Sequence, residues 1–319
     1  ILDEVSMIDM PLFYALLDAL PEQASLIMIG DSDQLPSVGP GNLLKDLIAG
    51  GAIKTVYLKE IFRQAQQSMI VMNAHAINTG RMPSLDASND FFFMRRNSAQ
   101  DLITTVKELC RTRLPSYFDI EPSQIQVIMP SKLRETGTYN LNNQLQTSLN
   151  PGRPGVREYR FGDMVFREGD KVMQIRNNYD ITWHKSDMSE AGWGIFNGDI
   201  GIIERISIEE EIIEINFDDR ITDYSLDLVE DLELAYAMTV HKSQGSEFEA
   251  VVFVAFDAPA RLLTRNILYT AVTRAKRVFV AVGKDEIIWR MTQNNDARTR
   301  YSGLKERIKL LRGSGNNEA

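Results

Sequence analysis

Cysteine and histidine are scarce in this sequence, and long apolar runs are missing. The 319 residues hold a single cysteine, Cys110, which excludes a disulfide framework and a cysteine-rich zinc site. The three histidines lie far apart in the sequence, so a compact transition-metal site is not expected. No apolar run approaches the roughly 18 residues of a membrane span, and no signal peptide is visible. We therefore expect a cytoplasmic protein in a reducing compartment, with no membrane partner.

Acidic and basic residues are unevenly distributed, although the net charge is only −9. Residues 204–233 hold 12 acidic and 2 basic side chains, whereas residues 261–312 hold 13 basic and 4 acidic ones. A basic segment beside an acidic one is compatible with a cationic track for a polyanion. Two solvated faces explain the same charges equally well.

Most of the chain alternates short apolar runs with amphipathic stretches, which predicts an α/β fold with a mainly parallel sheet. The buried strands are expected at residues 25–29, 55–58, 91–94, 124–129, 251–255 and 278–282, and the helices at 10–20, 42–48, 68–78, 101–114, 138–149 and, as a basic stretch, 261–276. Residues 162–232 differ, because short alternating runs are separated there by turn residues. That pattern predicts a small antiparallel β unit of SH3-like size, inserted into the α/β fold.

The sequence opens at Ile1, within an apolar run, without an initiator methionine or a polar lead-in. Domains normally begin with a polar segment or a helix cap. We therefore expect this chain to be a fragment of a longer protein.

Carboxylates and an amide follow two of the early apolar runs. Asp3 and Glu4 end the first run, where an aspartate can hold hydrated Mg²⁺ and a glutamate can orient an attacking water. Asp31 and Gln34 follow the run at residues 25–29, and an amide is suited to sensing a terminal phosphate. Each signal alone is weak. Many strands end in an aspartate or a glutamate, and a stretch of aspartate, serine and glycine is typical of an ordinary turn.

Further along the chain, residues 237–248 form a dense polar stretch that contains Thr239, His241 and Glu247. Such a loop can hold phosphates on one side and a ribose on the other. Arg63 and Arg274 each lie near the expected end of a strand or helix, where a guanidinium can stabilise charge on a γ-phosphate. A single arginine of this kind more often makes a solvated ion pair.

Taken together, six segments stand in an order that resembles the superfamily 1 helicases, most closely the RecD-like ATP-dependent DNA helicases. The segments are LDEVSMID at 2–9, GDSDQLPSVGPG at 30–41, IFRQ at 61–64, IMPSK at 128–132, TVHKSQGSEF at 239–248 and LYTAVTRAKR at 268–277. The resemblance extends over nearly the whole chain. It implies two RecA-like lobes, at 1–55 and at 56–161 with 234–319, and an SH3-like subdomain at 162–233.

The resemblance also implies roles for individual residues, with ATP and Mg²⁺ as cofactors. Asp3 corresponds to the magnesium ligand and Glu4 to the residue that activates water, while Gln34, with Asp31 in the same motif, corresponds to the γ-phosphate sensor. Arg63 and Arg274 correspond to the arginines that close on the γ-phosphate, and Glu247 to a ribose contact. Ser131, Lys132, Thr239 and His241 lie in motifs that line the single-stranded DNA track. The implied activity is 5′ to 3′ movement on single-stranded DNA and unwinding at duplex junctions.

One departure from the family is serious, because the phosphate-binding loop GxxxxGK[ST] is absent from the sequence. We expect the family's loop in an amino-terminal part of the same protein, and negligible ATPase and helicase activity for this chain alone. Other recombination or repair subunits are further expected partners.

Two other interpretations remain open at this point. The chain could be a DNA-binding or subunit-interaction module that retains a motor fold without hydrolysing ATP. It could also be a Mg²⁺-dependent nuclease that uses Asp3, Glu4, Asp9 and Asp31, although that leaves Arg63, Arg274 and the polar stretch unexplained.

Overall fold

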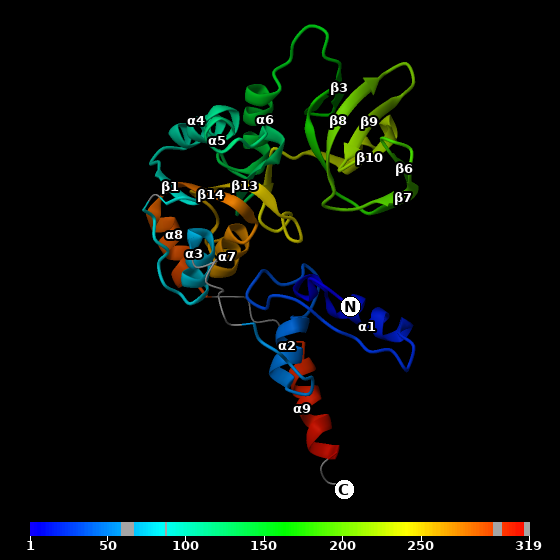
Figure 1. Ribbon diagram of the computed structural model, residues 1–319, viewed down its shortest axis with the longest axis vertical. Coiled ribbons are helices and arrows are strands. Elements are labelled where there is room, and N and C mark those ends of the chain that lie inside the picture. The colour runs from blue at the N-terminus through cyan, green and yellow to red at the C-terminus, as the bar shows by residue number, and fades with distance from the viewer. Residues whose placement is uncertain (59–66, 87, 296–301, 316–319) are drawn as a thin grey trace.

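The structure, a computed structural model, describes residues 1–58, 67–86, 88–295 and 302–315. Figure 1 shows a mixed helical and parallel-sheet unit, a β unit at one side of it, and an amino-terminal unit that carries both chain ends. The α/β class and the inserted antiparallel sheet predicted from the sequence are confirmed. Among the described residues, no helix combines the length and apolarity needed to cross a bilayer.

The central sheet has five strands in the order β1-β14-β13-β2-β12, and every neighbouring pair is parallel. Its strands are β1 (Phe91–Arg95), β14 (Ala275–Gly283), β13 (Phe248–Ala255), β2 (Ile125–Met129) and β12 (Ala237–Thr239). Val252 faces one buried cluster and Phe253 faces the other. Burial on both faces explains why the sequence shows continuous apolar runs here instead of alternation.

Helices cover both faces of this sheet. One face carries α4 (Ala99–Glu108), α5 (Leu114–Phe118) and α6 (Thr138–Leu149), and the other carries α3 (Met69–Asn78), α7 (Arg265–Val272) and α8 (Asp285–Gln293). The Ser98 side chain accepts a hydrogen bond from the Asp101 amide and caps α4, as serine commonly does at this position. The helix expected at 101–114 is interrupted by a π-helical segment at Leu109–Arg113.

The inserted unit is a seven-stranded antiparallel sheet in the order β11-β5-β8-β9-β10-β6-β7. Its strands are β5 (Lys171–Gln174), β6 (Asn178–Lys185), β7 (Ala191–Ile195), β8 (Ile200–Ser207), β9 (Ile212–Phe217), β10 (Arg220–Ser225) and β11 (Leu232–Leu234). A separate hairpin of β3 (Glu158–Phe161) and β4 (Met164–Arg167) precedes it and begins before the expected boundary at residue 162. Alternate residues of β9, such as Ile213 and Ile215, are fully buried, which matches the period of two in the sequence.

The amino-terminal unit contains α1 (Met10–Ala19) and α2 (Leu43–Gly50), and the carboxyl-terminal helix α9 (Leu304–Gly315) packs against it. Val5, Phe13, Leu43 and Leu47 form a small core, and Ile308 of α9 contacts that core. Figure 1 shows the red α9 beside the blue α2. This packing differs from the expected division, which placed all of residues 234–319 in the second lobe.

Three expected elements are wrong. Residues 25–29 form one parallel bridge, between Leu2 and Met28, and leave Ile27 57% and Ile29 51% exposed, because no second described segment pairs with them. Residues 55–58 are not a strand, since they pair with no described segment, and Leu58 is 98% exposed. The helix expected at 261–276 is confined to α7, because β14 already begins at Ala275.

Candidate functional site

Gln34 and Arg274 come together between the amino-terminal unit and the parallel-sheet unit. Nη2 of Arg274 donates a hydrogen bond to Oε1 of Gln34 over 3.1 Å. Nη1 of Arg274 donates to the Ser246 carbonyl at 3.0 Å, and Arg274 is only 3% exposed. Among the described residues, no ion pair involves this guanidinium, whose acceptors there are all uncharged. A buried guanidinium whose described hydrogen-bond acceptors are all neutral can bind an anion in place of one of them.

Helix α7 holds the loop at residues 30–37 through a row of polar side chains. The Tyr269 hydroxyl donates to Asp31 at 2.8 Å, and Thr270 accepts from the Leu35 amide at 3.0 Å. Asn266 donates to the Gln34 carbonyl at 3.3 Å. Burial, together with the Asp31 carboxylate, raises the pKa of Tyr269, so its hydroxyl remains a donor. Spacings of three and four residues place these groups on one face of the helix.

The polar stretch after β12 contacts the same loop. Gln244 donates from Nε2 to the Leu35 carbonyl at 2.8 Å. Gly245 has a φ of +76°, where glycine is favoured, and a Cβ atom at this position would lie 3.5 Å from the Met7 sulfur. The amino-terminal segment, the 30–37 loop, the polar stretch and α7 therefore converge in one region of the molecule.

Asp3 and Glu4 lie beside the beginning of that loop. The Val5 amide donates to the Ile29 carbonyl at 3.0 Å, and a Cβ atom at Gly30 would meet the Val5 nitrogen at 3.1 Å. Glu4 has a φ of 52°, a left-handed conformation that costs a non-glycine residue free energy and is concentrated at functional sites. In the described part of the chain, no hydrogen bond or ion pair joins Asp3 or Glu4 to Gln34 or Arg274.

The carboxylates fit a magnesium ion only if phosphates complete its shell. No group of three or more metal-ligating side chains occurs among the described residues. Asp9 is engaged elsewhere, since it accepts from the Leu12 amide and caps α1. Mg²⁺ in nucleotide sites takes one or two carboxylates, with phosphates and water as the other ligands, so Asp3 fits that role. Of the four carboxylates that the nuclease interpretation uses, Asp9 caps α1 and Asp31 accepts from the Tyr269 hydroxyl.

Two further residues are expected to contact the nucleotide, Arg63 and Glu247. Arg63 lies outside the described residues. Glu247 is exposed, with its carboxylate 3.8 Å from the Lys276 ammonium, and its neighbour Ser246 accepts the hydrogen bond from Arg274. Glu247 therefore stands at the rim of the region that holds Arg274.

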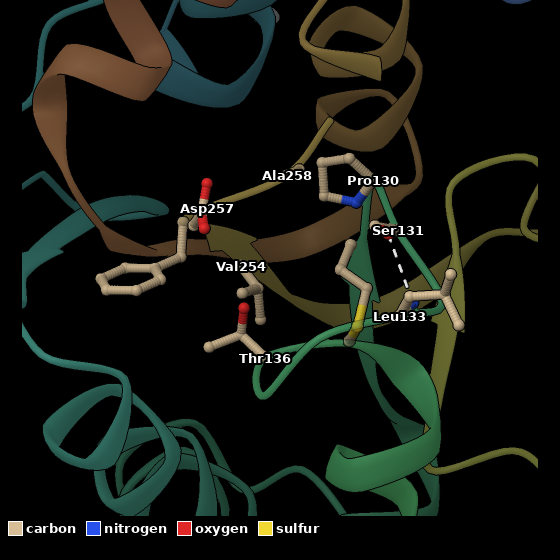
Figure 2. A pocket seen from close by; sticks show the side chains of 9 residues that line it. Pro130, Ser131, Leu133, Thr136, Val254, Asp257 and Ala258 are labelled. Atoms are coloured by element: carbon tan, nitrogen blue, oxygen red, sulfur yellow. Dashed lines mark hydrogen bonds between the residues drawn. The ribbon is translucent and has the colours of Figure 1, made fainter. Parts of the chain in front are cut away.

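The residues expected to line a DNA track gather at the carboxyl ends of β2 and β12. Thr239 of β12 pairs with Met129, the last residue of β2. Ser131 lies two residues beyond that end of β2. Ser131 accepts from the Leu133 amide at 3.3 Å beside a small pocket (Figure 2). The Lys132 ammonium lies 3.9 Å from Oε1 of Glu233. His241 is exposed in the loop that follows β12.

Comparisons with known proteins agree with this arrangement. Residues 141–217 match a family model described as the SH3 domain of ATP-dependent RecD-like DNA helicases. Residues 234–282 match the UvrD-like helicase C-terminal domain, and residues 1–96 match an AAA domain. Three segments of the chain are thus similar to helicase or ATPase domain families, and one of these families is of the RecD-like type. The SH3 match begins within α6, ahead of the residue 162 boundary expected for the RecD-like insert.

Curated relatives of the RecD type align with nearly the whole chain. The ATP-dependent RecD2 DNA helicase of Deinococcus radiodurans is 32% identical over 311 residues, which cover 97% of this chain and 39% of that protein. The RecD subunit of the RecBCD enzyme of Mycobacterium tuberculosis is 27% identical, with 97% and 53% covered. The chain therefore spans about half the length, or less, of these relatives.

A solved structure supports the fold. The crystal structure of a Pif1 helicase from Bacteroides, in complex with ADP-AlF3 and ssDNA, superposes with a TM-score of 0.51 at 18% identity. The match covers 99% of this chain and 75% of the Pif1 chain.

The sequence analysis missed several side chains of this candidate site. They are Asn266, Tyr269 and Thr270, which lie in or beside the LYTAVTRAKR segment. Their spacing, which places them on one face of a helix, is the sequence pattern that could have identified them. No sequence pattern identifies Glu233, because it is one of many acidic residues of the insert. Its contacts with Lys132 and Lys242 form only in the folded chain.

Proposed function

We propose that this chain is the carboxyl-terminal part of a motor that couples ATP hydrolysis to 5′ to 3′ movement on single-stranded DNA and to duplex unwinding. The observation that carries the proposal is the contact between Gln34 and Arg274. It joins two separately packed units through a buried cation whose described partners are uncharged. A γ-phosphate at that junction would supply the missing negative charge.

Each candidate residue has a defined task in this proposal. Asp3 holds Mg²⁺, and Glu4 orients the attacking water, while Gln34, which follows Asp31 in the loop, senses the terminal phosphate. Arg274, joined by Arg63, approaches the γ-phosphate when the units close, and Glu247 contacts the ribose. Tyr269 and Asn266 hold the 30–37 loop on α7, so a change at the phosphate moves one unit relative to the other.

Grip on the DNA is assigned to Ser131, Lys132, Thr239 and His241 at the carboxyl ends of β2 and β12. Contacts of this kind bind the phosphate backbone, so we expect tolerance of sequence and sensitivity to salt. The antiparallel insert flanks these strand ends through β11. We keep the predicted division into lobes at 1–55 and at 56–161 with 234–319, and an insert at 162–233, with α9 reassigned to the amino-terminal unit.

The proposed partners are single-stranded DNA, duplex junctions and an amino-terminal part of the same protein that supplies the phosphate-binding loop. Several relatives are named as RecD subunits of RecBCD enzymes, which supports recombination or repair subunits as further partners. The reducing, cytoplasmic compartment remains part of the proposal.

A direct test uses the full-length protein that contains this chain. We expect phosphate release from ATP that single-stranded DNA stimulates, and separation of a forked duplex with a 5′ tail but not of one with only a 3′ tail. DNA binding without ATP hydrolysis would favour the non-catalytic module instead. Unwinding from the 3′ tail would overturn the polarity alone.

A further inference from the structure

Two lysines of the proposed DNA track share one carboxylate. Glu233 lies on β11, the last strand of the antiparallel insert, and its side chain reaches toward the ends of β2 and β12. Oε2 of Glu233 accepts from the Lys242 ammonium at 2.6 Å, and Oε1 lies 3.9 Å from the Lys132 ammonium. Each oxygen of the carboxylate thus faces a different lysine.

The cluster is only partly open to solvent, which strengthens its charge interactions. The three side chains are between 21% and 38% exposed. Burial lowers the pKa of Lys242, while the Glu233 carboxylate acts against that shift and Lys132 adds to it. Two cations facing one anion leave an excess of positive charge, so the cluster remains attractive to a polyanion.

The position of the cluster points to its ligand. Lys132 follows Ser131, and Lys242 stands three residues after Thr239, so both lysines belong to the segments that leave the carboxyl ends of β2 and β12. A phosphodiester also presents two non-bridging oxygens that share one negative charge, as a carboxylate does. Lysine ammonium groups bind such oxygens as point charges.

We propose that Lys132 and Lys242 form a subsite for one phosphodiester of a single strand, and that Glu233 occupies this subsite when no strand is bound. The proposal rests on the proposed function, since it deepens the DNA track described there. A strand that enters the track displaces the Glu233 carboxylate from both lysines. Because Glu233 belongs to β11, its release also frees a contact between the insert and the parallel-sheet unit.

The test measures binding of a fluorescently labelled oligothymidylate to the 319-residue chain at low salt. Glu233→Gln removes the competing charge and keeps the shape of the side chain, so we expect affinity to rise about threefold to tenfold. Lys242→Met is expected to weaken binding by a similar factor. In a chain that carries both Lys132→Met and Lys242→Met, Glu233→Gln is expected to have no effect.

Glu230→Gln is the matched control, because it removes one negative charge from the neighbouring segment, where Glu230 faces the exposed Arg176. It is expected to change affinity by less than twofold, which separates a local effect from one of net charge. If the wild type binds the oligothymidylate and the folded Glu233→Gln variant binds it equally or more weakly, the subsite proposal is wrong. The proposed function is not affected by that result. Absence of oligothymidylate binding by wild type and all variants counts against the DNA track itself.

Discussion

The amide oxygen of Gln34 accepts a hydrogen bond from the Arg274 guanidinium at 3.1 Å, across a separation of 240 residues. Gln34 belongs to a loop of the amino-terminal unit, and Arg274 connects α7 to β14 of the parallel-sheet unit. A guanidinium that donates to a neutral amide oxygen can exchange it for an anion, because bidentate bonds from arginine to a phosphate or carboxylate are stronger than one bond to a neutral acceptor. In the proposed function, a phosphate bound at this pair changes the relation of the two units.

Replacement of Arg274 by lysine tests the proposed role at the γ-phosphate. Lysine keeps the positive charge but loses the planar fork that reaches Gln34, Ser246 and Thr270 at once. In the full-length protein we expect Arg274→Lys to lower kcat for ATP hydrolysis about 1,000-fold, within the range known for arginines that contact a transferred phosphoryl group. Steady-state phosphate release measures the effect.

Arg277→Lys serves as the control for that replacement, because Arg277 is half-exposed and donates only to the Phe118 carbonyl among its hydrogen bonds in the described chain. Its kcat is expected to stay within twofold of wild type. Equal losses in the two variants, or a fall in Arg274→Lys that follows a loss of folded protein, would argue for a structural role of Arg274.

The isolated 319-residue chain is expected to release no phosphate from ATP above background. The sequence holds no GxxxxGK[ST] loop, so the triphosphate lacks the backbone amides and the lysine that normally cradle it. Addition of single-stranded DNA should not change this result, although the same preparation should bind the DNA. Steady, ATP-dependent phosphate release by the purified chain would refute the expectation.

Local signals predicted most elements of the fold. Residues 138–149 carry an amphipathic pattern that ends at Asn150 and Pro151, and α6 occupies that range. The strands β13 and β14 were predicted from continuous apolar runs, since burial on both faces removes alternation. The order of polar motifs also placed Gln34 and Arg274 in one site before any geometry was known.

Long-range packing accounts for what the sequence analysis missed. The run at residues 25–29 is apolar enough for a buried strand, but whether it is buried depends on neighbours that local pattern does not reveal. The docking of α9 on α2 depends on a close fit, in which a Cβ atom at Gly50 would lie 2.9 Å from Ile308. Pairings such as Glu233 with Lys242 join an acidic insert to a distant motif, and charge runs alone do not specify them.

Asp170 is expected to be the most sensitive polar position between the insert and the parallel-sheet unit. It is fully buried and accepts from Gln146 at 2.5 Å, Asn150 at 2.8 Å, Tyr236 at 2.9 Å and the Arg167 amide at 2.7 Å. Asp170→Ala would leave these donors buried without an acceptor, so we expect a loss of about 3 kcal/mol in the free energy of unfolding. Urea denaturation measures it.

Asp163→Ala is the matched control, since Asp163 is exposed in the turn between β3 and β4. It is expected to change the free energy of unfolding by less than about 0.5 kcal/mol. A loss below about 1 kcal/mol for Asp170→Ala would mean that water replaces the carboxylate, and that the network contributes little to holding the insert.

Stability should also depend on pH through Lys171, whose buried ammonium donates to the Ser123 carbonyl at 2.8 Å. Burial lowers its pKa to about 8, whereas an unfolded lysine titrates near ~10.4. Between pH 8 and 9 this lysine therefore holds more protons in the unfolded chain than in the folded chain, so its contribution to the free energy of unfolding rises with pH, by about 1 kcal/mol per unit. Lys171→Met should remove this contribution in urea titrations.

Cys110 limits the rise at higher pH, because its contribution has the opposite sign. Burial raises the pKa of its thiol to about 12, whereas an unfolded cysteine titrates near ~8.5. Above pH 8 the folded chain retains the thiol proton that the unfolded chain loses, so this contribution to stability falls as pH rises. The two effects should nearly cancel between pH 9 and 10 in the wild type, whereas Cys110→Ala should show the full lysine rise from pH 8 to 10. A flat profile from pH 8 to 9 in Cys110→Ala would show that Lys171 stays charged in the folded protein.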